Sequence, residues 1–114
     1  MRRKLGMLLA GLGLVIAVPV GAHHGFDTEY DAVKKVKLSG VVSQVAWANP
    51  HMRVYVDVTD AAGTVTTWNM ELTSPNSVRR QGWGANDLKV GDKVNFEGYG
   101  GKVVESRGSL LSIS

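Results

Sequence analysis

The sequence predicts a mainly β domain that contains one short helix. Three observations support this fold class: apolar and polar residues alternate along several short runs, glycine-containing turns separate the runs, and a single helix-start signal stands among them. The 114 residues provide enough chain for one domain.

Residues 1–22 are organised like a secretory signal peptide. A positively charged start precedes the apolar run Leu5–Val18, and the small residues that follow it suit cleavage after Ala22. Because a membrane span needs roughly 20 apolar residues, we interpret the run as a signal-peptide helix rather than as a retained anchor. The pair Arg2-Arg3 leaves a twin-arginine signal as an alternative. We therefore expect a periplasmic or secreted protein without stable membrane insertion after its leader is removed.

The mature chain, residues 23–114, is expected to have no net side-chain charge. The full sequence has 13 Lys and Arg against 10 Asp and Glu, and three of the basic residues but none of the acidic ones lie within residues 1–22. Taking these three from 13 leaves 10 basic side chains against 10 acidic ones. A nucleic-acid-binding domain normally carries a clustered positive surplus, so nucleic acid is not expected as a partner. The absence of cysteine excludes disulfides, thiolate metal sites and cysteine nucleophiles.

The mature chain is expected to begin with an N-terminal arm, residues 23–35, followed by the domain proper, residues 36–114. Residues 26–35 of the arm mix acidic, basic and aromatic side chains without a sustained period. A long first strand follows over residues 36–47. Its apolar residues change parity at Gly40, which predicts a bulge or a bend there. Asn49-Pro50 then predicts a turn.

The clearest prediction is a hairpin between residues 52–59 and 67–72. Both runs alternate strictly, and the connection between them suits a three-residue loop with Gly63 in the left-handed conformation. This loop places Asp60 opposite Thr64, and the same register sets apolar residues opposite one another on one face of the hairpin. On the other face Arg53 lies opposite Glu71, Tyr55 opposite Asn69, and His51 beside Thr73.

A short helix and two further strands complete the expected domain. Thr73-Ser74-Pro75-Asn76 combines a hydroxyl cap with proline at the first helical position, and Gly82 ends the helix about two turns later. A fourth strand contains Val94 and Phe96, and Gly98-Tyr99-Gly100-Gly101 predicts the next turn. The fifth strand is expected over residues 102–114, with apolar residues Val103, Val104, Leu111 and Ile113.

This order of elements is that of a five-stranded OB-like barrel, with a first strand bent at a glycine and the helix between strands three and four. Closing the sheet would remove the exposed edges that short strands otherwise present. The alternative is an open antiparallel sheet or sandwich with one helix. Much of the core is expected to come from Trp47, Trp68, Trp83 and Phe96.

The polar face of the predicted hairpin is the first candidate site. Arg53, Tyr55, Asn69 and Glu71 share this face, and OB-folds bind ligands on the corresponding strands. Without net charge, the face suits a small polar ligand, a glycan or a protein. The plainer interpretation of Arg53 and Glu71 is a cross-strand ion pair on a solvated surface.

A non-catalytic binding protein is therefore the function that the residues favour. No nucleophile or second acid joins the candidate face, and no serine has a base placed beside it by a motif. An enzyme centred on Arg53, Glu71 and His51 is the least favoured alternative. It would require these three side chains to gather around a concave pocket.

The three histidines, His23, His24 and His51, are the candidate metal ligands. Cleavage before His23 would join an α-amine to its imidazole, a chelate that suits Cu(II) together with another imidazole. Cleavage one residue earlier would give Ala22-His23-His24, whose amine, amides and imidazole suit square-planar Cu(II) or Ni(II). His51 could add a nitrogen if the arm folds back. The plainer interpretation is a solvated tail and a surface histidine. On that interpretation the protein needs no cofactor, whereas on the metal-binding interpretation the cofactor is copper.

Several short motifs of the mature chain also carry a resemblance to a known family. Among them are His23-His24-Gly25-Phe26, Trp47-Ala48-Asn49-Pro50-His51, Glu71-Leu72, Ser74-Pro75-Asn76, Gly82-Trp83 and Val90-Gly91-Asp92. Across nearly all of residues 23–104 the chain resembles a family of small exported bacterial proteins described only as a domain of unknown function. Gly25 stands where that family usually has serine, and the tail from Glu105 is less regular. The resemblance implies export and a small β-barrel, and it implies no activity.

Overall fold

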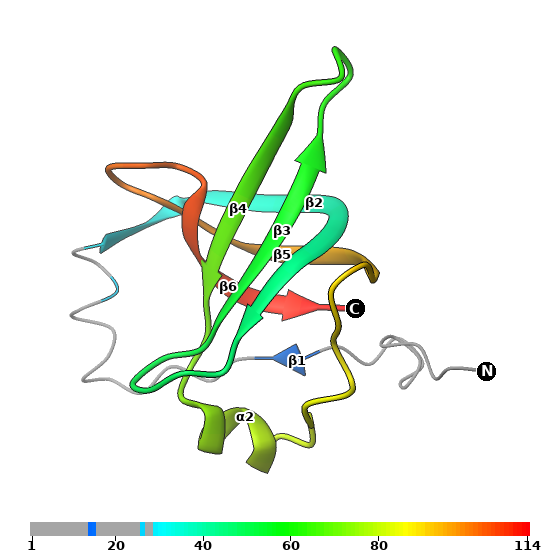
Figure 1. Ribbon diagram of the computed structural model, residues 1–114. Coiled ribbons are helices and arrows are strands. Elements are labelled where there is room, and N and C mark those ends of the chain that lie inside the picture. The colour runs from blue at the N-terminus through cyan, green and yellow to red at the C-terminus, as the bar shows by residue number, and fades with distance from the viewer. Residues whose placement is uncertain (1–13, 16–25, 27–28) are drawn as a thin grey trace.

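The computed structural model describes residues 14–15, 26 and 29–114. Over these residues the chain is mainly β, with one short helix (Figure 1). The strands are β1 Leu14–Val15, β2 Tyr30–Ala46, β3 Arg53–Thr59, β4 Val65–Glu71, β5 Lys93–Gly101 and β6 Arg107–Ile113, and helix α2 spans Pro75–Arg80. The expected order of three strands, a helix and two strands is confirmed by β2 to β6.

Of residues 1–22, the structure describes only Leu14 and Val15. The predicted signal-peptide helix otherwise lies outside the described residues, as do His23 and His24. Leu14 and Val15 form β1, which pairs antiparallel with the end of β6.

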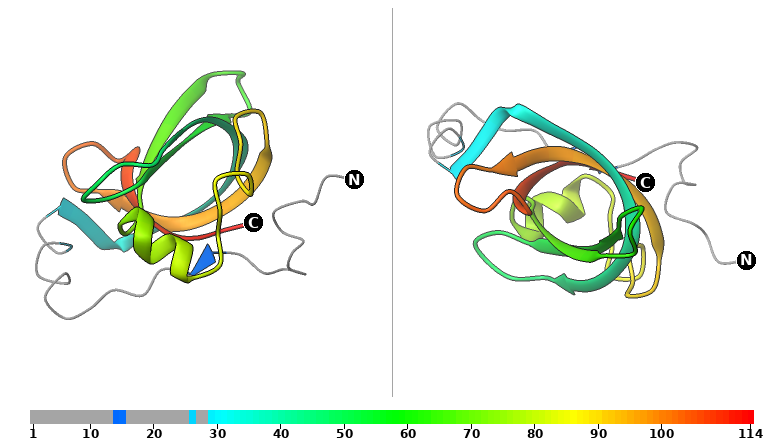
Figure 2. Two further views of the ribbon diagram at one scale, coloured as in Figure 1. Left: turned by 60° about the horizontal axis from the view of Figure 1, so that its bottom comes forward. Right: turned by 90° about the horizontal axis from the view of Figure 1, so that it is seen from above.

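The six strands form one sheet, in which each of the five long strands pairs with two of the other long strands. The strand order is β1-β6-β4-β3-β2-β5, and β5 also pairs with β6. β4 and β6 are parallel, whereas the other neighbouring pairs are antiparallel. The strands consequently curve around a shared interior, with α2 at one end (Figure 2).

The long strand β2 bends so that it can pair with two partners. Its first part, from Tyr30 to Val41, pairs with β5, and its second part, from Val41 onward, pairs with β3. At Gly40 a Cβ atom would lie 2.3 Å from the carbonyl oxygen of Asp57, so only glycine allows this close crossing. The predicted bend at Gly40 is confirmed, and the bulge itself lies between Val42 and Gln44.

The start of the first strand differs from the prediction. β2 begins at Tyr30 rather than at residue 36, so it includes part of the expected arm. Tyr30 and Lys35 pair with Gly101 and Tyr99 of β5, with an irregularity between them. Several side chains of this stretch, including Val33 and Lys34, are exposed. Backbone pairing with β5 rather than burial of alternate side chains therefore makes this segment a strand.

The hairpin between β3 and β4 is confirmed with its register. Arg53 pairs with Glu71, and Tyr55 pairs with Asn69. Gly63 has a φ of 86°, and the Asp60 side chain accepts hydrogen bonds from backbone N–H groups of the loop. The apolar face contributes Val54, Val56, Trp68 and Met70 to the core.

Helix α2 is confirmed at both of its ends. The Ser74 side chain accepts a hydrogen bond from the backbone N–H of Ser77, and Pro75 begins the helix. Gly82 follows with a φ of 101°. The guanidinium of Arg79 lies over the ring of Trp47, 5.2 Å from its centroid.

The predicted turn at Gly98-Tyr99-Gly100-Gly101 is wrong, because these residues end β5. A Cβ atom at Gly98 would lie 2.2 Å from the carbonyl oxygen of Ser109, so this glycine permits close approach of β6. The turn lies at residues 102–106, between β5 and β6. Val103 and Val104 consequently lie in the turn, and they are exposed rather than buried.

The core face of β6 (Arg107–Ile113) is interrupted by a bulge. Leu110 and Ile113 are buried, although an uninterrupted strand would turn them to opposite faces. The register with β5 shifts there, since Glu97 pairs with Ser112 and Gly98 with Leu110. Leu111 is the extra residue of this bulge, and its side chain is only partly buried.

The interior between the strands is apolar. Phe96 and Trp68 are buried, as predicted, whereas Trp47 and Trp83 are partly buried and pack against the core. Among the described residues no helix is long and apolar enough to cross a membrane.

Candidate functional site

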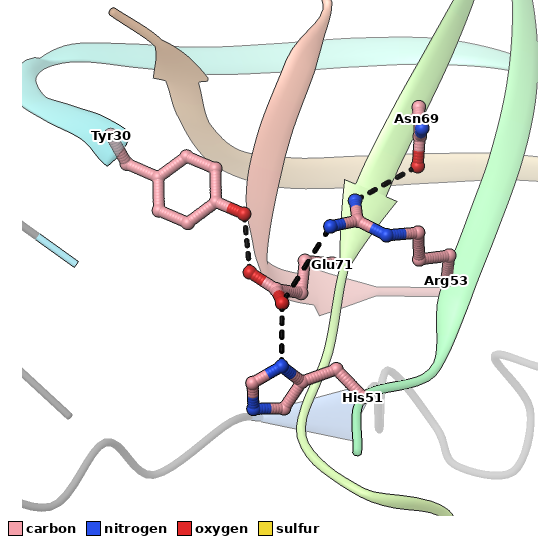
Figure 3. Close-up of polar contacts among 5 residues, drawn as sticks. All are labelled: Tyr30, His51, Arg53, Asn69 and Glu71. Atoms are coloured by element: carbon pink, nitrogen blue, oxygen red, sulfur yellow. Dashed lines mark hydrogen bonds and ion pairs between the residues drawn. The ribbon is translucent and has the colours of Figure 1, made fainter. Parts of the chain in front are cut away.

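A polar cluster surrounds Glu71, the last residue of β4. Figure 3 shows Tyr30, His51, Arg53 and Asn69 around this carboxylate. β2 supplies Tyr30, β3 supplies Arg53, and β4 supplies Asn69 and Glu71. His51 comes from the segment between β2 and β3, after the bend at Asn49-Pro50. We refer to these five residues as the Glu71 cluster.

Both carboxylate oxygens of Glu71 have partners. Oε1 accepts a hydrogen bond from the Tyr30 hydroxyl. Oε2 lies 2.6 Å from Nδ1 of His51 and 3.6 Å from Nη2 of Arg53. Because three side chains occupy this carboxylate, Glu71 fixes the positions of its neighbours and has little capacity left to take a proton from a substrate.

The second arm of the Arg53 guanidinium extends the cluster along the hairpin. Nη1 of Arg53 donates a hydrogen bond to Oδ1 of Asn69, at 3.0 Å. Arg53 thus bridges Glu71 and Asn69, which lie two residues apart on the same face of β4. Its planar donor set is held in one orientation by both contacts.

Burial decreases across the cluster from Tyr30 to His51. Tyr30 is only 5% exposed, and the side chains of Glu71 and Arg53 are 16% and 19% exposed. The His51 side chain is 52% exposed. A ligand would therefore meet the imidazole first, with the ion pair behind it.

The His51 ring is oriented through one of its nitrogens. The Glu71 carboxylate accepts a hydrogen bond from Nδ1 of His51. In the neutral imidazole Nδ1 therefore carries the hydrogen, and Nε2 keeps its lone pair. A carboxylate that binds one ring nitrogen in this way is common behind metal-ligating histidines. Nε2 can accept a hydrogen bond or bind a metal ion.

Tyr30 reaches Glu71 from an aromatic cluster at the start of the sheet. The ring of Phe26 packs against those of Tyr30 and Tyr99, each with its centroid 5.4 Å away. Burial, the hydrogen bond to Glu71 and the negative charge of that residue together raise the pKa of Tyr30 well above its usual range. The Tyr30 hydroxyl therefore stays a donor at physiological pH.

Four of the predicted site residues meet in this cluster. Arg53, Asn69, Glu71 and His51 are joined by the contacts above. Tyr55 pairs with Asn69 in the register of the hairpin. His23 and His24 lie outside the part of the chain that the structure describes.

Tyr30 is the member of the cluster that the sequence interpretation missed. It lies 41 residues from Glu71, in a stretch without regular alternation. In the structure, Tyr30 pairs with Gly101 of β5, and the backbone N–H of Lys102 donates a hydrogen bond to the carbonyl of Glu29 beside it. An isolated aromatic residue before a strand was the sole signal in the sequence, and it does not indicate a partner.

Two hollows lined by described residues lie close to the sheet, and neither is centred on Glu71. One of about 390 Å³ is lined by Glu29, Tyr30, Gly101, Val103, Val104 and Arg107. Another, of about 350 Å³, lies around the bend at Gly40 and includes Asp57 and Lys93. Of the Glu71 cluster only Tyr30 contributes to either lining, so the concave pocket required for an enzyme centred on Arg53, Glu71 and His51 is not formed by these hollows.

The described residues do not form a metal site by themselves. Among them, no group of three or more His, Cys, Asp and Glu is arranged to hold a metal ion. His51 provides one oriented imidazole nitrogen, and Glu71 is already engaged. Further ligands would have to come from elsewhere.

The comparisons with known proteins give one match. The model of DUF6152, a family of unknown function, covers residues 12–110. This range includes all five residues of the Glu71 cluster. No curated protein and no solved structure matches the chain.

Proposed function

The chain belongs to the DUF6152 family of unknown function, and we propose that it is an exported, non-catalytic binding protein. Its ligand would lie on the polar face of β3 and β4, above the Glu71 cluster. Export is supported by the charged, apolar and small-residue segments of residues 1–22, which we propose are removed after translocation. The protein would then act in the periplasm or outside the cell.

We further propose that β2 to β6 form an OB-like barrel. The sheet closes through the pairing of β5 with β6, and β4 pairs with β6 in parallel. The helix between the third and fourth long strands completes this plan. OB-folds bind ligands on their second and third strands, which correspond to β3 and β4 here.

The arrangement of Glu71 carries the binding proposal. Its carboxylate holds Arg53 and His51 in fixed orientations, and Arg53 in turn holds Asn69. Such preorganisation lowers the entropy that a ligand must overcome on binding. Because the positive charge of Arg53 is balanced by Glu71, a neutral or zwitterionic polar ligand, a glycan or a polar protein surface fits the face better than a polyanion.

Nuclear magnetic resonance of the exported protein tests this proposal. The probes are a neutral oligosaccharide, a zwitterionic amino acid and a neutral tripeptide, each added to the ¹⁵N-labelled protein. We expect one class to shift the signals of Arg53, Tyr55 and the Asn69 side-chain amide in a saturable way. Replacing Arg53→Lys should then weaken binding about tenfold, because one lysine ammonium cannot reproduce both guanidinium contacts.

Glu97→Gln serves as the matched control for this titration. Glu97 forms an ion pair with Lys35 at 3.6 Å on β5 and β2, outside the Glu71 cluster. Its substitution should leave the affinity unchanged. Absence of saturable shifts on the β3–β4 face with all three probes would contradict the proposed binding site.

A second candidate function, copper binding, is favoured by the His51–Glu71 contact. The contact leaves Nε2 of a half-exposed imidazole available. We propose that His23 and His24, at the start of the processed chain, would supply the other nitrogens, including the α-amine. These ligand types suit Cu(II) in tetragonal geometry.

Addition of Cu(II) to the exported protein, followed by visible absorption, tests this candidate. We expect a d–d band that His23→Ala abolishes. Glu71→Gln should weaken the affinity about 10- to 100-fold, because it removes the carboxylate that orients the imidazole. The Glu97→Gln protein should bind normally. Equal copper binding by a form with residues added before His23 would show that the α-amine takes no part.

A further inference from the structure

The outer edge of β6 near the C-terminus is covered by a segment from the leader. β4 pairs with β6 only at Arg107–Ser109 and ends at Glu71, before α2. Beyond that point, Ile113 and Ser112 pair with Leu14 and Val15 of β1. The same strand β6 pairs with β5 along its other edge.

The backbone N–H and C=O of Ile113 are the hydrogen-bonding groups on the edge of β6 that faces β1. Ser114 exchanges two backbone hydrogen bonds with Asn95, at 2.8 and 2.9 Å, and therefore faces the β5 side. Because backbone groups alternate between the two edges of a strand, the N–H and C=O of Ile113 face β1. Ile113 is only 1% exposed, so these groups need a partner while the edge is covered.

From this arrangement we infer that the edge of β6 at Ser112–Ile113 is a strand-addition site in the processed protein. Its occupant is an extended segment of a partner protein, antiparallel to β6, with adjacent aliphatic residues like Leu14-Val15. This inference rests on the proposed export, because removal of residues 1–22 takes β1 away and leaves the edge open. An open edge with unpaired backbone groups is a template for such pairing.

A second copy of the chain is a less suitable occupant. The strand that a second copy would bring to this edge is β6 itself, whose residues near the edge include Ser112 and Ser114. The segment seated there in the structure is aliphatic, Leu14-Val15. We therefore assign the edge to an aliphatic segment supplied by another protein.

Amide hydrogen exchange at Ile113 provides a direct test. The exported protein without its leader is compared alone and with a peptide of residues 11–18 of the same sequence. We expect the Ile113 amide to exchange fast in the protein alone and at least about tenfold more slowly with saturating peptide. The Ser112 amide, on the β5 side, should remain protected in both samples.

Two modified peptides provide the matched controls. If Leu14 exchanges hydrogen bonds with Ile113, N-methylation of Leu14 removes the donor and should abolish protection. N-methylation of Val15, whose N–H points away from β6, should leave it intact. Equal behaviour of the two peptides, no protection by the unmodified peptide, or a dimer that the peptide does not dissociate would overturn the inference.

Failure of the inference is distinguishable from failure of the proposed export. The mass of the exported protein shows by itself whether the leader has been removed. If it is retained, the full chain with Leu14→Pro should show faster exchange at Ile113 and should recover protection when the unmodified peptide is added. Unchanged exchange at Ile113 in that variant would contradict the strand-addition site.

Discussion

At the scale of single residues, Glu71 connects the polar side chains of the candidate face into one network of hydrogen bonds and ion pairs. Its donors come from three separate parts of the chain: Tyr30, His51 and Arg53. Exposed ion pairs contribute little to stability, but Glu71 and Arg53 are both mostly buried. Removal of Glu71 would leave the positive charge of Arg53 mostly buried and without its ion-pair partner.

Glu71→Ala is therefore expected to destabilise the protein by about 2–3 kcal/mol, because it leaves a mostly buried guanidinium and a buried hydroxyl without their acceptor. Glu97→Ala removes an exposed pair and should cost no more than about 1 kcal/mol. Urea unfolding of the unsubstituted protein and of the two variants at neutral pH measures both losses of stability. Equal losses in the two variants would contradict the central role of Glu71.

Tyr30 makes the free energy of unfolding depend on pH in the alkaline range. Its pKa is raised in the folded state, mainly by burial, whereas the unfolded chain titrates near the ordinary value of 10.0. The resulting stabilisation is fully present below that value and is lost as the pH rises above it, since only the unfolded state then releases the proton.

Tyr30→Phe should consequently reduce stability at pH 8 by about 1.5–3 kcal/mol, the typical contribution of a hydrogen bond to a charged group. The difference between the two proteins should become smaller above pH 10. Urea titrations at pH 8 and at pH 10.5–11 measure this difference. A gap that stays constant or widens with pH would show that Tyr30 does not act as described.

At the scale of elements, the bend of β2 sets the position of the candidate face. This strand pairs with β5 from Tyr30 to Val41 and with β3 from Val41 onward, so Tyr30 and the β3–β4 hairpin belong to one framework. The close approach of Gly40 to Asp57 is what allows this change of partner.

Gly40→Ala should destabilise the protein by about 1–3 kcal/mol, because the new methyl group would overlap the Asp57 carbonyl and a side-chain carbon of Val56. Gly84→Ala is the control, since its Cβ would have only an ordinary contact, 3.6 Å from Asp87. Thermal unfolding of both variants provides the comparison. A Gly40→Ala protein as stable as the control would contradict the close crossing.

The elements that could be predicted are those with local signals. The β3–β4 register followed from the three-residue hairpin loop and from alternating residues on both sides of it, and α2 followed from its cap and its glycine. These signals were enough to bring Arg53, Asn69 and Glu71 onto one face.

The elements that were missed depend on contacts between distant segments. Gly98 belongs to a glycine-rich stretch that is typical of a turn. It lies in a strand instead, where the absence of a side chain lets β6 approach closely. The bulge at Leu111 depends on pairing with β5, and Tyr30, which pairs with Gly101, contacts a residue 41 positions away. None of these partners is adjacent in sequence, so local patterns could not identify them.

At the scale of the whole molecule, the proposed functions depend on removal of residues 1–22. It would change a chain with a formal charge of +3 into one with balanced charges. It would also create an α-amine at His23 and uncover the edge of β6 that β1 now occupies. The binding face, the copper candidate and the strand-addition edge therefore share one processing event.

The intact mass of the protein recovered from the periplasmic fraction tests this claim most directly. We predict the mass of residues 23–114, with His23 as the first residue. A mass that still includes residues 1–22 would contradict the account.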